Sequence, residues 1–335
     1  MRRRPPRPAA PDRRRGRRRR LALVGAVGAA LTATLLLPGG TPVGHFTSAD
    51  AHDRFRVAYD RALADLPVPE RVRDLRTGYG VVRVYQFAST APQGGADAVP
   101  IVLLPGRGAA SPVWADNLPG LRRLAPVYAI DLLGEPGLSV QARPIVDDAE
   151  QAAWLHEVLA QLPEPRVDLL GMSIGGWTAA NLAVHRPERV RSLVLLDPVL
   201  VFAPLAPAAV VRSVPASVRW FPRAWRDDFA SWTANGAPVE DEPVAAMIEA
   251  GLQTYALALP PAGRPTEQEL AGLDRPVLVV VAGRSRLHDP VRVARTATDR
   301  LPRARVVVYA DASHAVNGEQ PARIAADVAA FRDSL

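Results

Sequence analysis

The chain has 335 residues, 48% of them hydrophobic and 22% charged, and it contains no cysteine, so disulfides, thiolate metal sites and a cysteine nucleophile are excluded. Its net charge of +7 arises from residues 1–20, which hold eleven arginines and one aspartate, whereas the remainder of the chain is slightly acidic. The positive charge therefore belongs to a tail and not to a folded surface, and nucleic-acid binding is not expected.

An apolar run at residues 21–37 follows the arginines and ends at Pro38. Its length is the lower limit for a spanning helix and slightly exceeds that of a signal-peptide core. The positive-inside rule predicts residues 1–20 as a cytoplasmic tail, residues 21–38 as a transmembrane or signal-anchor helix, and the rest of the chain outside the cytoplasm. No clear cleavage site follows the run. We therefore expect an uncleaved single-pass anchor in the cell membrane, with secretion after cleavage as the alternative.

Residues 39–77 are expected to form a linker and one amphipathic helix. Ser48 and Asp50 can cap the start of this helix, and Pro67 and Pro69 stop it. Its expected apolar face consists of Phe55, Val57, Ala58, Tyr59, Ala62 and Leu63. The helix should pack against the following domain or lie between that domain and the membrane.

From residue 78 to residue 335, short apolar runs alternate with helical stretches. Continuous apolar runs are typical of strands buried on both faces of a sheet. The expected strands are residues 81–87, 100–104, 127–130, 167–170, 190–196, 277–281 and 306–309. The expected helices are residues 149–162, 175–185, 291–301 and 321–331. This alternation predicts an α/β domain whose central sheet is mostly parallel and is covered by helices on both faces.

Residues 198–273 interrupt this alternation, and an insertion of this size between two core strands predicts a lid. The segment concentrates aromatic residues between positions 220 and 232. Two interpretations remain open. The aromatic side chains pack the lid onto the core, or some of them line a substrate pocket, for which the candidates are Trp220, Phe221 and Trp225.

The sequence G-x-S-x-G occurs at Gly171, Ser173 and Gly175. It follows an apolar strand and opens a helix, which is the setting that an exposed nucleophilic serine requires. Glycines on both sides leave room for the tight bend, and the helix N-terminus favours a developing negative charge. We therefore predict that Ser173 is a nucleophile.

With this turn, residues 78–335 resemble the α/β-hydrolase superfamily, and most closely its carboxylesterase-like members with an inserted lid. The resemblance implies that the loop Pro105-Gly106-Arg107 helps to form an oxyanion hole, with the backbone N–H groups of Arg107 and Ile174 as donors. Pro105 replaces the histidine that is usual in this loop, but no backbone donor is lost. The resemblance also implies a structural role for the loop that begins at Asp131.

His314 lies in a loop between the last expected strand and the last expected helix, which resembles the loop that carries the family's catalytic histidine. We predict it as the general base. The acid is less clear, because Arg286 occupies one position where the family often has it. Asp197, which follows an earlier strand, is preferred, and Asp289, which can also cap a helix, is the alternative.

These residues predict a serine hydrolase that cleaves an ester or related acyl bond of a small molecule through an acyl-enzyme on Ser173, with His314 as general base. No metal or organic cofactor is implied. A cofactor-free perhydrolase of the same fold is one alternative. A non-catalytic exported binding protein is the other. The sequence does not define the substrate or the oligomeric state, and membrane contact is expected only through residues 21–37.

Overall fold

The computed structural model describes residues 41–91, 98–217, 222–237 and 242–335. The chain divides after Thr41, and the unit from Pro42 to Leu335 is the one described below. The predicted tail, the predicted membrane helix and the lid candidates Trp220 and Phe221 lie outside the described residues. In the part of the chain that is described, every helix is too short or too polar to cross a membrane.

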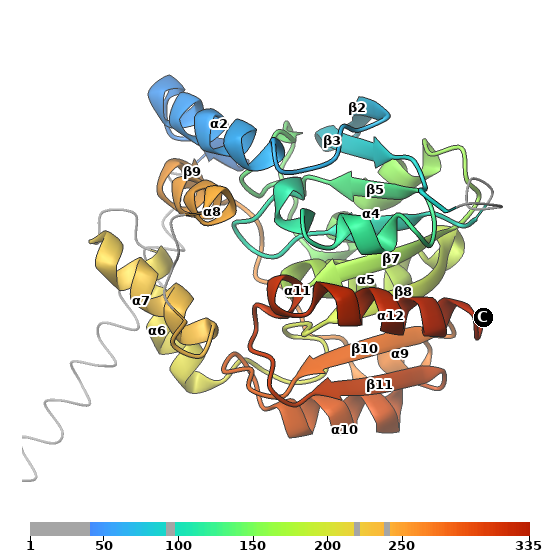
Figure 1. Cartoon of the computed structure of the whole chain (residues 1–335). Coiled ribbons are helices and arrows are strands. Elements are labelled where there is room, and N and C mark those ends of the chain that lie inside the picture. The colour runs from blue at the N-terminus through green and yellow to red at the C-terminus, as the bar shows by residue number, and fades with distance from the viewer. Residues whose placement is uncertain (1–40, 92–97, 218–221, 238–241) are drawn as a thin grey trace, which may run out of the picture. The chain divides into compact units, whose positions relative to one another are not determined.

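A nine-stranded sheet runs through this unit (Figure 1). Its strands are β2 (Arg71–Thr77), β3 (Gly80–Phe87), β4 (Ile101–Leu104), β5 (Val127–Ile130), β6 (Val140–Gln141), β7 (Val167–Met172), β8 (Val190–Leu196), β10 (Val277–Ala282) and β11 (Ala304–Tyr309). Their order is β11-β10-β8-β7-β4-β5-β3-β2, with β6 paired to β3. All neighbours from β11 to β5 are parallel, and the contacts of β3 are antiparallel. The expected mostly parallel sheet is confirmed.

The sheet begins earlier than expected, because Arg71–Thr77 forms an edge strand that pairs with β3 and is not part of a linker. Its two apolar residues, Val72 and Leu75, are three positions apart among arginines and an aspartate, and most of its residues are exposed. Charged side chains protect an exposed edge from pairing with another chain, and they also hide the apolar alternation that identifies a strand. Central strands such as β4 and β5 are buried at every residue and were recognisable for that reason.

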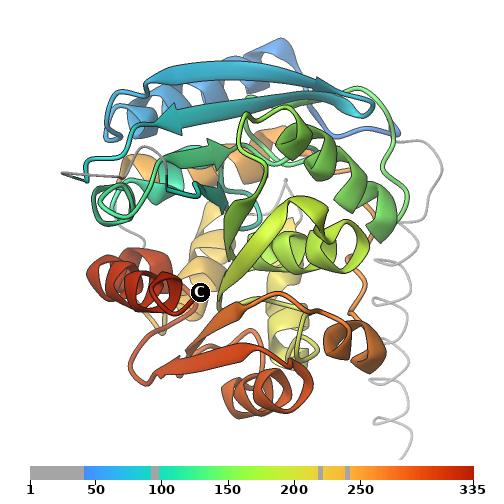
Figure 2. The ribbon, with the colours of Figure 1, turned by 90° about the vertical axis from the view of Figure 1, so that its right-hand side faces the viewer.

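Helices cover both faces of the sheet (Figure 2). One face packs on α4 (Asp148–Ala160), α5 (Ile174–His185) and α10 (Pro290–Arg300). The other packs on α3 (Leu118–Leu121) and α12 (Pro321–Arg332). The short elements η1 (Ser111–Trp114), η2 (Pro187–Arg189) and α11 (Val316–Glu319) lie in the connections. The core is thus two apolar layers, one on each side of the strands.

The expected amphipathic helix is α2 (Ala49–Leu63), and Ser48 caps it by accepting a hydrogen bond from the backbone N–H of Ala51. Its buried residues include Phe55 and Tyr59, but Val57 is 54% exposed, so its place on the apolar face was wrong. The helix turns by about 100° per residue, and Val57 lies two positions from each of these residues and therefore points away from them.

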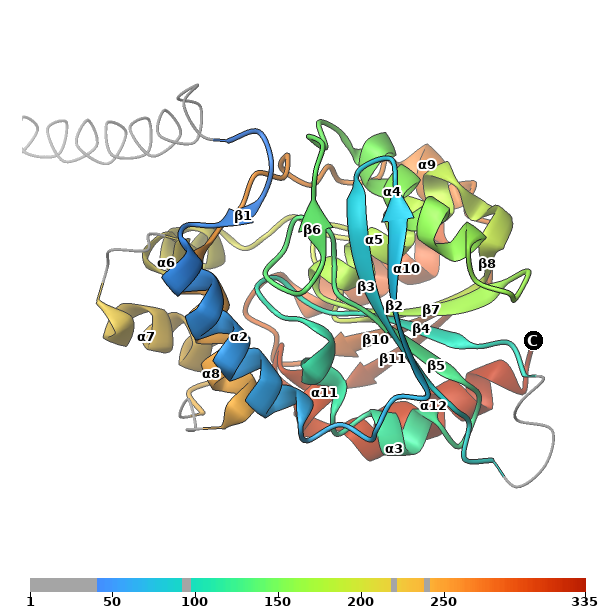
Figure 3. The ribbon, with the colours of Figure 1, turned by 90° about the horizontal axis from the view of Figure 1, so that it is seen from above.

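Residues 42–63, here called the N-terminal arm, contact the segment that was expected to form a lid. α2 packs against α8 (Pro243–Thr254), and the two helices lie side by side in Figure 3. Ahead of α2, the short strand β1 (His45–Phe46) pairs antiparallel with β9 (Tyr255–Ala256). The arm is therefore joined to the end of α8 by backbone hydrogen bonds as well as by apolar packing.

The segment between β8 and β10 contains α6 (Pro207–Ser217), α7 (Arg223–Thr233), α8, β9 and α9 (Glu267–Ala271). Helices α6, α7 and α8 lie beyond the carboxyl ends of the central strands (Figures 1 and 3). The last residue of α7 reaches back toward the sheet, where the carbonyl oxygen of Thr233 accepts a hydrogen bond from the backbone N–H of His314 at 3.3 Å. These helices therefore cover the edge of the sheet where Ser173 is located.

Candidate active site

Ser173 stands at the sharp turn between β7 and α5, with φ 56° and ψ −118°. A side chain other than glycine's is strained at this φ, and such strain is concentrated at functional sites. The flanking glycines are required by space: a Cβ at Gly171 would lie 2.2 Å from the carbonyl oxygen of Gly175, and one at Gly175 would lie 2.1 Å from that of Leu104. The turn lifts the Ser173 hydroxyl to the carboxyl end of β7.

Three side chains form a hydrogen-bonded chain at this edge. The Nε2 atom of His314 lies 2.9 Å from Oγ of Ser173, and its Nδ1 atom lies 2.6 Å from Oδ2 of Asp197. His314 comes from the loop between β11 and α11, and Asp197 directly follows β8. Because β7, β8, β10 and β11 are parallel, their carboxyl ends bring the loops together at one edge. The arrangement has the geometry of a nucleophile, a base and an orienting acid.

Asp197 is fully buried and accepts four hydrogen bonds. Oδ1 accepts from the backbone N–H of Ala282 at 3.1 Å and from His288 at 3.0 Å, and Oδ2 accepts from Ser285 at 2.7 Å and from His314. Burial by itself raises the pKa of Asp197. The hydrogen bonds from His288 and His314 outweigh burial and hold this pKa well below its usual range. The carboxylate is therefore ionised at neutral pH.

Asp289, the alternative acid, lies elsewhere. It is the N-cap of α10, where its Oδ1 accepts from the backbone N–H groups of Val291 and Arg292 at 3.0 and 3.2 Å. Arg286 is exposed, and its guanidinium points to the carbonyl oxygen of Trp232 in α7. The structure brings Asp197, and not Asp289, to His314.

The loop at Gly106 lies directly against the serine, since a Cβ at Gly106 would be 3.6 Å from Cβ of Ser173. Glu135 holds this loop through an ion pair with the Arg107 guanidinium at 2.8 Å and a hydrogen bond from the backbone N–H of Gly108 at 3.1 Å. Burial raises the pKa of Glu135, against the opposing effects of Arg107 and the Gly108 N–H. The backbone N–H groups of Arg107 and Ile174 make no hydrogen bond within the described residues. Arg107 follows Gly106 and Ile174 follows Ser173, so both predicted donors adjoin this turn, and their role in an oxyanion hole stays a prediction.

Asp131 was expected to be structural, and its contacts agree with that role. Its carboxylate accepts from the backbone N–H and hydroxyl of Ser111, from the backbone N–H of Leu138 and from the hydroxyl of Tyr59. All four partners hold loops or α2 in place, and none belongs to the Ser173 chain of contacts. Among the described residues, no group of three His, Asp or Glu side chains is arranged to hold a metal ion.

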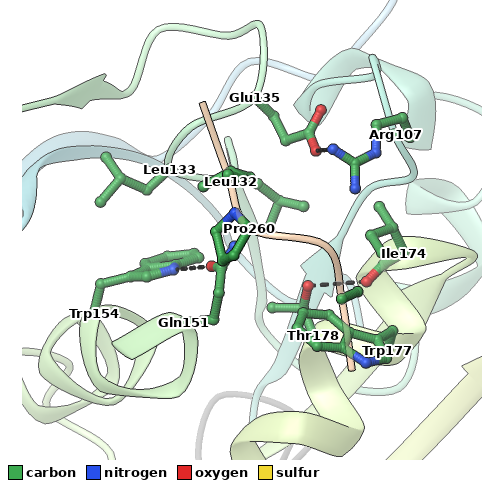
Figure 4. A pocket seen from close by; sticks show the side chains of 12 residues that line it. Arg107, Leu132, Leu133, Glu135, Gln151, Trp154, Ile174, Trp177, Thr178 and Pro260 are labelled. Carbon is green, nitrogen blue, oxygen red and sulfur yellow. Dashed lines mark hydrogen bonds and ion pairs between the residues drawn. The ribbon is translucent and has the colours of Figure 1, made fainter. Parts of the chain in front are cut away.

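A small pocket lies beside α5, and Ile174, the residue after Ser173, is part of its lining whereas Ser173 is not (Figure 4). Most of the side chains that line the pocket are apolar, and the Arg107–Glu135 ion pair is among the polar ones. The lining residues are Arg107, Leu132, Leu133, Glu135, Gln151, Trp154, Ile174, Trp177, Thr178, Leu259, Pro260 and Ala262. The cavity volume is about 10 Å³, the space of about one water molecule. Leu259, Pro260 and Ala262 of the segment 198–273 contribute to the lining, and the Trp177 indole N–H donates to the carbonyl oxygen of Gly263 at 2.6 Å.

Of the three aromatic side chains expected to line a substrate pocket, Trp225 lies within the described residues, whereas Trp220 and Phe221 do not. Trp225 lies on α7, is 52% exposed and does not line this pocket. Trp154 and Trp177 line it instead, from α4 and α5. A tryptophan on a helix that covers the sheet suggests core packing, so sequence reasoning missed both. His288 was also missed as a partner of Asp197, because the contact joins loops that follow two different strands.

The chain belongs to the alpha/beta hydrolase family, whose model matches residues 101–327. It is similar to the carboxylesterase YbfK of Bacillus subtilis, with 24% identity over 85% of this chain and 96% of that protein. It is also similar to the uncharacterized carboxylesterase nap of the same organism, with 24% identity over 80% of this chain and 88% of that protein. This chain is therefore an enzyme of the hydrolase class.

Solved structures share the fold. The crystal structure of naproxen esterase from Bacillus subtilis has a TM-score of 0.77 and 24% identity, covering 85% of this chain and 99% of that one. The crystal structure of a membrane phospholipase A, a bacterial virulence factor, has a TM-score of 0.67 and 23% identity, covering 94% of this chain and 98% of that one.

Proposed function

We propose that this hydrolase cleaves carboxylic esters through an acyl-enzyme on Ser173. The observation that carries the proposal is the continuous chain of hydrogen bonds from Ser173 through His314 to Asp197. In such a chain the imidazole removes the proton from the hydroxyl, and the buried carboxylate holds the correct tautomer and stabilises the imidazolium. The carboxylesterase relatives support the same bond class.

In the first half of the proposed reaction, Oγ of Ser173 attacks the ester carbonyl while Nε2 of His314 takes the hydroxyl proton. The oxyanion accepts hydrogen bonds from the backbone N–H groups of Arg107 and Ile174. When the C–O bond breaks, His314 returns the proton to the leaving alkoxide, and an alcohol departs. In the second half, His314 deprotonates water, the hydroxide attacks the acyl-enzyme, and the acid leaves as Ser173 regains its proton.

The walls of the pocket suggest the kind of acyl or aryl group that binds. Trp154, Trp177 and the leucines around them favour an apolar group, while the small volume requires the lid segment to move before a larger group binds. A series of p-nitrophenyl esters of increasing acyl length measures this preference. A preference for bulky charged substrates over apolar ones would contradict it.

A fluorophosphonate probe tests the mechanism directly, because it reacts only with an activated serine. The full-length protein should be labelled and should hydrolyse p-nitrophenyl acetate. Ser173→Ala should abolish both, and Ser334→Ala, at an exposed serine near the C-terminus, is the matched control that should abolish neither. A folded wild-type protein that neither labels nor hydrolyses any ester would overturn the proposal.

The two alternatives from the sequence are separated by the same assays. A binding protein without catalysis was suggested by Arg286 at a usual acid position, but the acid contact to His314 is made by Asp197, which removes that argument. A perhydrolase would use the same residues with hydrogen peroxide in place of water. Comparing peracid formation with ester hydrolysis in the same preparation measures which acceptor the acyl-enzyme prefers.

We also propose that residues 21–37 anchor the protein in the cell membrane, with the hydrolase unit outside the cytoplasm. The support is the sequence alone: an apolar run of 17 residues directly after an arginine-rich tail. After cell lysis and an alkaline carbonate wash, the full chain should stay with the membrane fraction. A chain shortened to residues 42–335 should not. Recovery of a shortened, soluble protein from the extracellular fraction would favour secretion after cleavage instead.

A further inference from the structure

The buried side chain of His288 makes a contact that the proposed mechanism does not use. His288 lies in the loop that follows β10, and 1% of its side chain is exposed. Its Nε2 atom is 3.0 Å from Oδ1 of Asp197, the carboxylate oxygen that does not face His314. Two imidazoles therefore bind the two oxygens of one buried carboxylate.

The hydrogen bonds around Asp197 define which nitrogen of His288 carries the proton. An ionised carboxylate only accepts hydrogen bonds, so Nε2 of His288 must donate. Its Nδ1 atom is buried and has no hydrogen-bond partner within the described residues. A proton on Nδ1 would create an unpaired buried donor on a buried cation, which is costly. The arrangement thus favours a neutral imidazole with its hydrogen on Nε2.

The four donors to Asp197 also limit how its carboxylate can turn. The Ala282 N–H and His288 occupy Oδ1, and Ser285 shares Oδ2 with His314. Because Asp197 adopts φ 41°, its backbone holds the side chain in this position only while the surrounding contacts persist. Of these four donors, His288 and His314 are the two imidazoles.

We propose that His288 is a positioning residue of the active site: as a neutral Nε2–H donor it fixes the Asp197 carboxylate so that Oδ2 faces Nδ1 of His314. The inference rests on the proposed function of Ser173. A neutral donor suits this task because it holds the carboxylate without cancelling the charge that stabilises the His314 imidazolium. The charged residues of the same loop are Arg284, Arg286 and Asp289, all exposed, and His314 lies beyond the carboxylate.

Substitutions in the full-length protein test the role. His288→Phe removes the donor and keeps an apolar ring, and we expect kcat on p-nitrophenyl acetate to fall about 10- to 100-fold, as for loss of a hydrogen bond to a charged group, with little change in KM. The acid limb of the kcat/KM profile should move to higher pH, because a carboxylate with one donor fewer favours the protonated form of His314. His288→Gln, whose amide can donate from nearly the same position, should restore most of kcat and the original profile.

His156→Gln is the matched control, since His156 lies on α4 and makes no contact with Asp197; its kcat and pH profile should match the wild type. A His288→Phe protein that is folded by circular dichroism and retains wild-type kcat and pH profile would overturn the proposal. If His288→Phe does not fold, His288→Gln is the test. A folded His288→Gln protein whose kcat falls as far as that of Asp197→Asn would also overturn the proposal.

The tautomer gives a readout that does not depend on activity. In a protein labelled with ¹⁵N at its imidazoles, the His288 signal, assigned by its loss in His288→Gln, should show a neutral ring protonated at Nε2 at pH 7. A doubly protonated ring, or a proton on Nδ1, would overturn the inference. Failure of the proposed function would look different, because the wild type would then not react with the fluorophosphonate probe whatever the His288 spectrum shows.

Discussion

The Arg107 guanidinium and the Glu135 carboxylate form an ion pair at 2.8 Å on the loop that faces Ser173. The side chain of Glu135 is buried, whereas that of Arg107 is partly exposed, and the second oxygen of Glu135 accepts from the backbone N–H of the next glycine. The Glu135 carboxylate therefore fixes both the side chain of Arg107 and the peptide bond between Arg107 and Gly108. The backbone N–H of Arg107 is one of the two proposed oxyanion donors. The loop can hold this geometry without the histidine that Pro105 replaces.

Glu135→Ala should lower kcat more than it changes KM. Without the carboxylate, the peptide of Arg107 is free to turn away, and loss of one oxyanion donor costs about 10²- to 10³-fold in rate. Glu135→Gln, which still can accept from the Gly108 N–H, should lose less. Steady-state kinetics with p-nitrophenyl acetate gives both parameters. Wild-type kcat in a folded Glu135→Ala protein would contradict the assigned role.

Asp197→Asn and Asp289→Asn should separate the two acid candidates. Asparagine at position 197 no longer selects the tautomer of His314 that places a proton on Nδ1, and kcat should fall by about 10⁴-fold. Asparagine caps helices about as well as aspartate, so Asp289→Asn should keep both activity and stability. Asp289→Ala, which removes the cap of α10, should cost about 1 kcal/mol of unfolding free energy and leave kcat unchanged. Equal losses of kcat at both positions would contradict the assignment.

The lowered pKa of Asp197 predicts a pH dependence of stability. A carboxyl group whose pKa is lower in the folded than in the unfolded chain stabilises the fold above its unfolded pKa, about 3.9, and loses this contribution as the pH falls through the folded value. The wild type should therefore lose more unfolding free energy between pH 7 and pH 3 than Asp197→Asn does. Urea unfolding at both pH values measures the difference, and equal losses in the two proteins would contradict it.

Tyr59→Phe should reduce stability without reducing activity. The buried Tyr59 hydroxyl donates to Asp131 at 2.9 Å and lies 2.9 Å from the hydroxyl of Tyr85, and burial together with Asp131 raises the pKa of Tyr59 far above its usual value. Removing it leaves Asp131 with one donor fewer, at a cost of about 1–3 kcal/mol. Tyr128→Phe, at a hydroxyl that donates to the less buried Glu164, is the control and should cost less. Thermal unfolding measures the loss of stability, and kcat on p-nitrophenyl acetate should stay at the wild-type value. A Tyr59→Phe protein with wild-type stability would contradict the prediction.

The parts of this protein that the sequence predicted well are local patterns. Gly171 and Gly175 predict the bend at Ser173. The central strands are predicted by apolar runs that are continuous in the chain. The structure brings His314 to Ser173 as expected from its place after the last strand. The role of Arg107 and Ile174 as oxyanion donors, inferred from the two turns that carry them, stays a prediction.

The parts that could not be predicted depend on contacts between distant segments. Asp197 was the preferred acid, but Asp289 stayed open because both follow core strands, and the contact with His314 distinguishes them. His288 meets Asp197 across 91 positions of sequence. The edge strand β2 was hidden by its charges, and Trp154 and Trp177 look like core residues until the pocket beside them is known.

The pairing of β1 with β9 makes the N-terminal arm a mechanical connection as well as a packed element. Its only two register pairs join His45 and Phe46 to Ala256 and Tyr255. Ahead of these pairs, the backbone N–H of Gly44 donates to Oε1 of Gln141 in β6 at 2.8 Å, so tension applied along the chain at Pro42 would load Gln141 first and then Tyr255 and Ala256 at the end of α8. A pull at Pro42 would therefore be shared between β6 of the sheet and the helices that cover Ser173.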